Sequence, residues 1–264
     1  MSFANKVVIV TGSSSGIGET TAIHFGKLGA DVVLVGRNEK RLNNVAKQLA
    51  ANGKTPLIVQ ADVGKTEDAK RIIQSTVDKY KKIDVLVNNA GVVLLRNIDE
   101  DNLVDIYDQT FETNFRSVVL LTNLAAPYLK KTKGNIVNIA SIAGKSTMGA
   151  ITFGSGPLCA SKAAMEQFSR NSAMELAEFG VRVNIVSPGP VETPIFEAGG
   201  KDNVDWQDMA NRVTALKHLT QPEEVARMIA FVAHEDQKSV TGADFVIDSG
   251  FLINAFLDKW TIQH

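Results

Sequence analysis

The sequence contains few of the residues that build disulfides, metal centres or membrane spans. It has 264 residues and one cysteine, Cys159, so no disulfide can form within the chain. The apolar run 7–10 is far shorter than the roughly 20 residues that a membrane-spanning helix needs. Four histidines are scattered without the spacing of metal ligands: His24, His218, His234 and His264. We therefore expect no disulfide, no metal site and no membrane span, and a cytoplasmic location.

The charge is almost balanced, which argues against polyanionic partners. Lys and Arg number 28 against 29 Asp and Glu, giving a net charge of -1. A chain without excess positive charge creates no long-range attraction for nucleic acid or an anionic membrane, so neither is an expected partner. No linker or repeat divides the sequence, and 44% of it is hydrophobic, so we expect one domain spanning residues 1–264.

Short β-branched runs alternate with longer amphipathic segments along the chain. Continuous apolar runs of this kind are typical of strands buried on both faces, and strand–helix alternation predicts a parallel sheet covered by helices on both sides. The expected fold is a doubly wound α/β domain with a seven-stranded parallel sheet. The predicted strands are 6–10, 31–35, 56–60, 83–87, 135–140, 181–186 and 243–248, and the predicted helices are 17–29, 38–52, 66–81, 101–131, 157–179 and 221–234.

A glycine-rich turn follows the first predicted strand and precedes the first helix. The stretch TGSSSGIG, residues 11–18, places glycine at Gly12, Gly16 and Gly18. Glycines let the backbone turn tightly and approach a pyrophosphate, whose charge is met by free N–H groups at the helix N-terminus. The spacing differs from GxGxxG, but the strand before it and the helix after it favour a dinucleotide site in a Rossmann-type fold.

The end of the second predicted strand indicates which nicotinamide cofactor is preferred. Sites that prefer NAD usually place an acid here for the ribose 2′-hydroxyl, whereas this chain reads Gly36-Arg37-Asn38. The planar, permanently charged fork of Arg37 suits a 2′-phosphate. We therefore expect NADP(H) to be preferred over NAD(H), the alternative being that Arg37 is an ordinary surface residue.

The stretch 188–220 is the one irregular part of the chain, with prolines and glycines before an amphipathic piece around Trp206. Loops this long in a compact domain are often lids or binding elements. We expect a substrate lid at about 188–217, and its apolar residues favour a hydrophobic small-molecule substrate. The alternative is that these side chains only pack the lid itself.

Several further motifs occur in order along nearly the whole chain, and with them the sequence resembles the classical short-chain dehydrogenase/reductase family. These motifs are TGSSSGIG, NNAG (88–91), Asn114 in ETNFRS, Ser141 in NIASIAG, ASK (160–162) and SPG (187–189). The resemblance implies hydride transfer between a nicotinamide and an alcohol or carbonyl carbon. It also implies a homodimer or homotetramer, for which 101–131, 157–179 and the last strand are candidate contacts.

The resemblance also implies which residues bind the cofactor. Ser14, Ser15 and Ile17 would join the glycines at the phosphates, and Asp62 and Val63 would lie near the adenine. The remaining implied residues surround the nicotinamide and its ribose: Asn89, Ala90, Gly91, Lys162, Pro188, Gly189, Val191 and Thr193.

Three residues receive catalytic roles by the same resemblance. Ser141 would hydrogen-bond the substrate oxygen, Lys162 would hold the ribose and lower the pKa of a tyrosine, and Asn114 would anchor a water relay. Each has a purely structural alternative: Ser141 satisfying backbone groups, Asn114 tying helix to sheet, and Lys162 lying solvated on a helix.

The expected tyrosine is replaced at position 158. In the family it lies four residues before the lysine, one helical turn away, and here that residue is Leu158. The segment between Ser141 and Leu158 is also longer than is usual in the family. Three interpretations remain open: an NADP(H) oxidoreductase with an atypical site, an NADP(H)-binding protein that senses or scaffolds without turnover, or an inactivated variant of an ordinary enzyme.

Overall fold

The computed structural model describes residues 1–51, 53–148, 154–193 and 205–254, and it contains one seven-stranded parallel sheet. Every predicted strand is confirmed to within a few residues, and the strand order is β3-β2-β1-β4-β5-β6-β7. The strands are β1 (Val7–Thr11), β2 (Asp31–Gly36), β3 (Leu57–Gln60), β4 (Val85–Asn88), β5 (Asn135–Ile139), β6 (Arg182–Pro188) and β7 (Asp244–Ile247).

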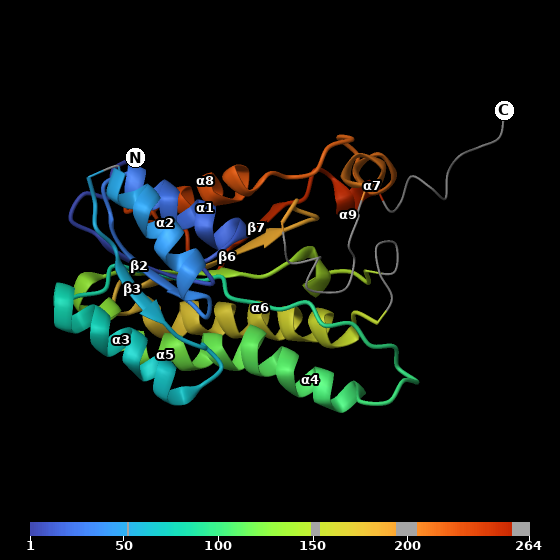
Figure 1. Cartoon of the computed structure of the whole chain (residues 1–264), viewed down its shortest axis with the longest axis horizontal. Helices are drawn as coiled ribbons and strands as arrows, with labels where there is room; N and C mark the ends of the chain where they lie inside the picture. Colours follow the sequence, from blue (N-terminus) through green and yellow to red (C-terminus); the bar gives the residue numbers. More distant parts are fainter. Residues whose placement is uncertain (52, 149–153, 194–204, 255–264) are drawn as a thin grey trace.

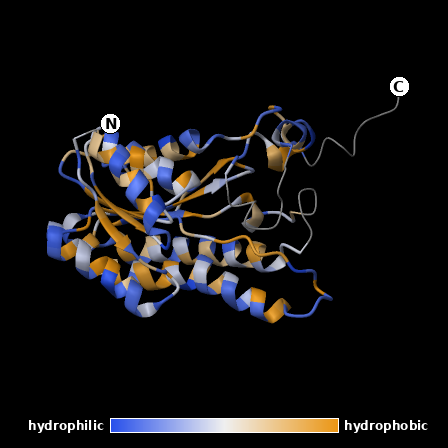
Figure 2. Cartoon of the chain, viewed as in Figure 1, coloured by the Kyte–Doolittle hydropathy of each residue, from blue (hydrophilic) through white to orange (hydrophobic). Residues whose placement is uncertain are grey.

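The central strands are buried on both faces, as their unbroken apolar sequences predict. In β1, Val8 pairs with Val32 of β2 on one side and with Val85 of β4 on the other. All five residues of β1 are buried, and so are all five of β5. Figure 2 shows these strands as a hydrophobic layer between helices whose outer surfaces are hydrophilic.

Helices cover the two faces of the sheet in separate layers (Figure 1). One layer contains α1 (Gly16–Lys27), α2 (Glu39–Ala51) and α8 (Pro222–Ala233), and the other contains α3 (Thr66–Tyr80), α5 (Ser117–Thr132) and α6 (Gly156–Ala177). Each layer buries its own apolar cluster against the sheet, with Phe25 at one and Leu121 at the other. No helix of the described residues is long and apolar enough to cross a membrane.

The predicted helix 101–131 is divided into three parts. The chain forms α4 (Leu103–Phe111), then the π-helical segment η1 (Glu112–Arg116), then α5. A π-helical turn adds a residue to the helix and commonly marks a functional site. Here it contains Asn114, which is completely buried.

In the described part of the irregular region after β6, the amphipathic piece forms the helix α7 (Trp206–Val213). β7 is followed by the short α9 (Phe251–Asn254). An isolated bridge joins Val191 to Thr220, so the two ends of the proposed lid lie beside each other. Residues 194–204 of this lid lie outside the described residues.

The order of the strands indicates where a ligand-binding crevice should lie. The connections from β1 to β2 and from β4 to β5 run in opposite directions along the sheet, so the chain diverges between β1 and β4. Open α/β sheets bind ligands outside the carboxyl ends of the strands at such a switch point. The first helix begins there, directly after the glycine-rich turn.

Candidate active site

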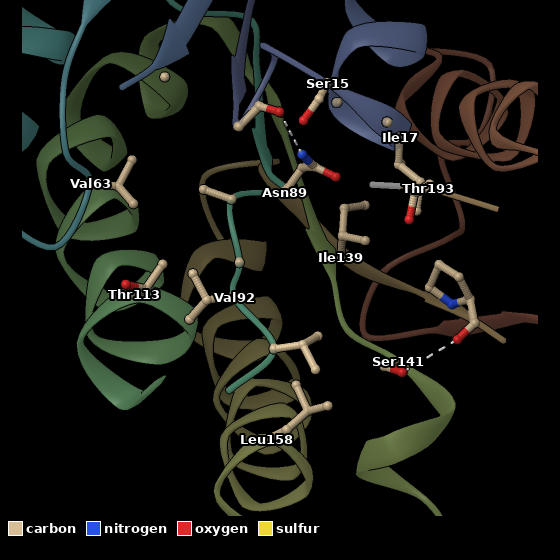
Figure 3. Close-up of a pocket in the computed structure, with 18 of the residues that line it drawn as sticks. Ser15, Ile17, Val63, Asn89, Val92, Thr113, Ile139, Ser141, Leu158 and Thr193 are labelled. Carbon is tan, nitrogen blue, oxygen red and sulfur yellow. Dashed lines mark hydrogen bonds between the residues drawn. The ribbon is translucent and has the colours of Figure 1, made fainter. Parts of the chain in front are cut away.

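A cavity of about 860 Å³ opens at the carboxyl ends of the strands, and Figure 3 shows part of its lining. Every predicted site residue except Asn114 lines this cavity. The structure brings together all the others: Gly12, Ser14, Ser15, Gly16, Ile17, Gly18, Arg37, Asp62, Val63, Asn89, Ala90, Gly91, Ser141, Leu158, Lys162, Pro188, Gly189, Val191 and Thr193.

The glycine-rich turn is built so tightly that side chains are excluded from two of its positions. Gly12 has a φ of +65°, and a Cβ added there would lie 2.9 Å from the Cα of Ala90. A Cβ on Gly18 would lie 2.2 Å from the carbonyl oxygen of Gly12. The glycines therefore let the turn fold against the β4 end and the start of α1, which explains why the sequence has them.

The turn is fastened to the end of β4 by hydrogen bonds. The side-chain nitrogen of Asn89 donates to the Thr11 carbonyl oxygen at 2.8 Å, and the backbone N–H of Asn89 donates to the Thr11 hydroxyl at 2.9 Å. Figure 3 marks a longer bond from Asn89 to the Gly12 carbonyl. Asn89 thus holds two walls of the cavity together as well as lining it.

The first helix presents an uncapped N-terminus to the cavity. Ser15 is the N-cap residue, with extended backbone, but its side chain makes no capping hydrogen bond. The first-turn N–H groups of a helix have no partner within the helix, and the helix dipole is positive at this end. Ser15, Gly16 and Ile17 therefore form a site suited to a phosphate.

Two arginines line the cavity beside the end of β2, close to the glycine-rich turn: a Cβ on Gly36 would lie 3.3 Å from the Ser14 hydroxyl oxygen. Arg37 follows β2 and is exposed, and Arg41 lies in the first turn of α2. Asn38 begins that helix by accepting a hydrogen bond from the backbone N–H of Arg41 at 3.0 Å. Arg37 was predicted from the sequence and Arg41 was not, although a second arginine four residues later is a signal that the sequence offers.

Ser141 lies at the end of β5, where it begins the 3₁₀ turn η2 (Ile142–Gly144). Its hydroxyl accepts a hydrogen bond from the N–H of Ala143 at 3.1 Å and donates to the carbonyl oxygen of Pro188 at 3.5 Å. The second contact is at the outer limit of a hydrogen bond. The hydroxyl is therefore positioned by the turn but can redirect its proton into the cavity.

Lys162 is a buried cation at the cavity wall, not a solvated helix residue. Its Nζ donates to the carbonyl oxygen of Ile139 at 2.7 Å, and the residue is 7% exposed. Burial disfavours the charged form and lowers the pKa of the Lys162 ammonium from 10.5 to about 8. The ammonium is therefore still the main form at neutral pH, but it loses its proton more easily than an exposed lysine does.

Asn114 lies behind the cavity wall and is committed to the backbone of Val92. The Val92 N–H donates to its Oδ1 at 2.8 Å, and its Nδ2 donates to the Val92 carbonyl at 3.0 Å. A further bond of 3.3 Å reaches the hydroxyl of Ser161, which in turn donates to the Leu158 carbonyl at 2.8 Å. Asn114 therefore connects the loop after β4 to the start of α6.

Comparison with known proteins identifies the chain. The family model described as enoyl-(acyl carrier protein) reductase matches residues 12–252. A short-chain dehydrogenase/reductase of unknown function from Caenorhabditis elegans, solved with cofactor, is 35% identical, covers 95% of this chain and 96% of its own, and has a TM-score of 0.89. The protein belongs to the short-chain dehydrogenase/reductase family.

Two further solved structures of similar fold hold different nicotinamide cofactors. A short-chain dehydrogenase from Burkholderia cenocepacia, in complex with NADP, is 28% identical with a TM-score of 0.87 and covers 96% of this chain and 100% of its own. A 7α-hydroxysteroid dehydrogenase, complexed with NADH and 7-oxo glycochenodeoxycholic acid, is 26% identical with a TM-score of 0.87 and 95% coverage of both chains. The short-chain dehydrogenase/reductase family, to which this chain belongs, is thus a family of oxidoreductases that use nicotinamide cofactors.

The short-chain dehydrogenase/reductase cavity contains no phenol among its described lining residues. Leu158 is half-buried one turn before Lys162 on α6, and it lines the cavity together with Val92 (Figure 3). The chain's three tyrosines lie elsewhere: Tyr80 ends α3, Tyr107 stacks on Phe111 of α4, and Tyr128 lies on α5.

The wall opposite the cofactor residues is apolar, and the sequence analysis did not anticipate most of it. It contains Val92, Val93 and Leu94 from the loop after β4, together with Met148 and Leu158. This loop has no strand or helix pattern, so its position depends on Asn114, a contact between segments 22 residues apart. Polar residues of α4 and η1 that also line the cavity, and that the sequence analysis did not identify, are Gln109, Glu112 and Thr113.

Proposed function

We propose that this protein is an NADP(H)-dependent oxidoreductase that moves hydride between the nicotinamide and an alcohol or carbonyl carbon of a hydrophobic small molecule, in a site without the usual tyrosine. The observation that carries the proposal is the continuity of one cavity. It extends from the glycine-rich turn and Arg37 past Gly91 to Ser141 and Lys162.

The residues present fit a dinucleotide. The turn that excludes a Cβ at Gly12 and Gly18 and the uncapped N-terminus of α1 would hold the pyrophosphate, and Asp62 and Val63 would lie at the adenine. Lys162, Pro188, Gly189, Val191 and Thr193 would surround the ribose and nicotinamide. When bound, the nicotinamide would supply or accept the hydride, while the protein binds and orients it.

A preference for NADP(H) over NAD(H) rests on the two arginines at the adenosine end. Arg37 offers a guanidinium to a 2′-phosphate, and Arg41 adds a second positive charge on the same wall. Of the described residues after β2 that line this end of the cavity, none is acidic; Asp62 follows β3. The 2′-hydroxyl of NAD(H) would therefore lack the carboxylate that commonly accepts its hydrogen bond.

The hydrophobic substrate is supported by the wall of Val92, Val93, Leu94, Met148 and Leu158. Ser141 would donate to the substrate oxygen, and Asn114 would act by positioning the Val92 loop and by anchoring a water relay toward Lys162. The proposed lid at about 188–217 would add further apolar cover.

A second function is favoured by Leu158, because a branched alkyl group cannot exchange a proton. The chain would then bind NADP(H) as a sensor or scaffold without turnover, or represent an inactivated variant of an ordinary reductase. A positioned general acid is worth about 10²–10⁴-fold in rate, so its loss leaves room for slow catalysis as well as for none.

Titration with NADPH and NADH tests the proposal directly. Tighter binding and larger thermal protection by NADPH are expected, followed by NADPH oxidation with a panel of ketones, aldehydes and quinones. Binding without turnover in the native chain and in Leu158→Tyr would favour the sensor or scaffold. Turnover that appears only in Leu158→Tyr would favour the inactivated variant, and absence of any NADPH binding would refute both cofactor-based functions.

A homodimer or homotetramer in the cytoplasm completes the proposal. Large apolar side chains are exposed on the three elements expected at subunit contacts: Val104 on α4 is 69% exposed, Met174 on α6 is 73% and Val246 on β7 is 42%. Contact with a second subunit would remove this surface from water. Light scattering coupled to size-exclusion chromatography measures the oligomeric state.

A further inference from the structure

We infer that Lys145 is a positioning residue for the Ser141 hydroxyl, although it lies outside the described lining of the cavity. It acts through an ion-pair cluster that it forms with Glu166 and Asp244 behind the cavity wall. The inference rests on the proposed function, in which Ser141 donates to the substrate oxygen. It adds to that function a group that affects the reaction only by holding another residue in place.

One short turn connects Ser141 to Lys145. The Gly144 N–H donates to the Ser141 carbonyl at 3.0 Å, and the Lys145 N–H donates to the Ile142 carbonyl at 2.9 Å. The Ser141 hydroxyl accepts a hydrogen bond from the Ala143 N–H of the same turn at 3.1 Å. The direction of the hydroxyl therefore depends on how η2 is held against the rest of the domain.

The turn packs directly on α6 beside Lys162. A Cβ added to Gly144 would lie 2.6 Å from Oε1 of Glu166, and it would lie 3.0 Å from the backbone nitrogen of Ala163. The carbonyl carbon of Lys162 would also be 3.0 Å away. Because glycine has no side chain, η2 can lie against the part of the helix that carries both Lys162 and Glu166.

Two carboxylates from two different elements hold the side chain of Lys145. Its Nζ lies 2.9 Å from Oε2 of Glu166 on α6, and it also forms an ion pair with Asp244, the first residue of β7. The side chains of Glu166 and Asp244 are only 7% and 12% exposed. Salt screens such partly buried pairs much less than surface pairs, so the cluster holds the end of η2 to both elements.

Asp244 also supports the second group that contacts the Ser141 hydroxyl. Its Oδ1 accepts a hydrogen bond from the Ser187 hydroxyl at 2.7 Å. Ser187 precedes Pro188 at the end of β6, and the Pro188 carbonyl accepts the 3.5 Å contact from Ser141. The cluster therefore supports the backbone on both sides of the hydroxyl.

The physics of buried ion pairs favours a positioning role over a contribution to stability. Taking charges out of water costs free energy that their attraction often does not return, and apolar residues of similar volume are often as stabilising. Oε1 of Glu166 is buried without a hydrogen-bond partner among the described residues, which adds to this cost. An ion pair fixes the distance and direction between its partners, and this is what the Ser141 turn requires.

Kinetics of the native chain and of two variants test the inference. Lys145→Met/Asp244→Asn removes the ion pair but keeps the charges balanced, since Glu166 still has Arg170 at 3.4 Å. A misplacement of about 1 Å can cost about 10²-fold in rate, so kcat for carbonyl reduction should fall by about 10–10²-fold with little change in NADPH affinity. Lys145→Arg, which can form both ion pairs, should stay close to the native rate. A decrease in Lys145→Arg as large as in the double variant would contradict the inference.

A carbonyl probe reports on the hydroxyl without turnover. The absorption band of 4-(dimethylamino)benzaldehyde moves to longer wavelength when its oxygen accepts a hydrogen bond. With NADP⁺ bound, the native chain should shift this band, Ser141→Ala should not, and Lys145→Met/Asp244→Asn should shift it less than the native chain does. The control is Lys54→Met, which removes an ion pair of 3.0 Å with Asp31 away from the cavity and should keep the full shift. A full shift in the double variant would overturn the inference alone.

Amide hydrogen exchange examines the support of the turn without any ligand. Asp244→Asn changes no bond within η2, yet it should speed exchange of the N–H groups of Gly144, Lys145 and Ser146, while Lys54→Met should not. Unchanged exchange in Asp244→Asn would refute the inference whatever the native chain binds. Failure of the native chain to bind NADPH, or a probe band that shifts equally in Ser141→Ala, would instead refute the proposed function.

Discussion

The Nζ atom of Lys162 lies 2.7 Å from the carbonyl oxygen of Ile139, so the amine of α6 is hydrogen-bonded to the last residue of β5. Ser141, two residues after the end of β5, lines the same cavity. Together with the 2.8 Å hydrogen bond from Asn138 of β5 to the Ser169 hydroxyl of α6, this bond joins the helix that carries Lys162 and Leu158 to the strand that leads to the hydroxyl.

The buried amine of Lys162 should give the stability of the protein a particular pH dependence. Its pKa is lowered by burial from 10.5 to about 8 in the folded chain. Between these values the unfolded state binds the extra proton, so this residue makes the free energy of unfolding rise with pH. Each unit of pKa shift corresponds to about 1.4 kcal/mol.

Urea unfolding of the native chain and of Lys162→Met, at pH values on both sides of 8, measures this contribution. The native chain should gain stability relative to the variant as the pH rises. Lys6 and Lys145, whose pKa values are raised by their carboxylate partners, are present in both proteins and cancel in the comparison. A difference independent of pH would contradict the prediction.

Reversing the charge at Arg37 should change the cofactor preference. Arg37→Asp removes a charged donor for the 2′-phosphate and supplies a carboxylate for a 2′-hydroxyl. Hydrogen bonds to charged groups contribute about 1.5–3 kcal/mol, so NADPH affinity should fall by about 10–150-fold while NADH affinity rises. Fluorescence titration measures both, and Lys47→Asp on the exposed surface of α2, outside the cavity, is the charge-matched control.

A methyl group at Gly18 should disrupt the phosphate turn. Its Cβ would lie 2.2 Å from the Gly12 carbonyl oxygen and 2.4 Å from the Asn89 side-chain nitrogen, so the backbone must move. Overpacking of this kind costs about 1–3 kcal/mol, and NADPH affinity should fall at least tenfold with it. Gly156→Ala is the matched control, because a Cβ there meets nothing within 4 Å, and differential scanning fluorimetry should show it unchanged or stabilised.

Removing the amide of Asn114 should loosen the wall formed by the loop after β4. Asn114→Ala leaves the N–H and C=O of Val92 without their partners, at a cost of about 1–3 kcal/mol. In a protein of this size each kcal/mol lowers Tm by about 2–4 °C. The control is Asn43→Ala, whose exposed side chain bonds only within α2, and an equal Tm decrease in both variants would count against a clamping role.

The sequence predicted the sheet well because its strands are buried on both faces and read as unbroken apolar runs. It predicted the phosphate end of the cavity because the glycine-rich turn and Arg37 directly follow strands whose carboxyl ends meet, and the rest of the predicted lining came from the resemblance to the family. It did not predict the division of 101–131 or the inward turn of Asn114. The π-helical segment depends on a long-range contact with Val92, which no local pattern records.

The sequence also did not predict the apolar wall at the substrate side of the cavity. Val92, Val93 and Leu94 form an irregular segment, and their place in the wall is set by Asn114 rather than by any periodicity. Arg41 could have been predicted, because it follows Arg37 by only four residues and lies in the first turn of α2. The lid expected at 188–217 remains a prediction, since residues 194–204 lie outside the described part of the chain.

Hydrogen bonds hold the backbone of α6 around Leu158, the position at which the family has a tyrosine. The Cys159 N–H bonds to the Ser155 carbonyl at 2.9 Å, and the Ser161 hydroxyl bonds to the Leu158 carbonyl at 2.8 Å. A protein engineer can therefore exchange this one side chain without rebuilding its support. Comparing the rates of hydride transfer in the two proteins would then measure the contribution of a single hydroxyl in an otherwise identical chain.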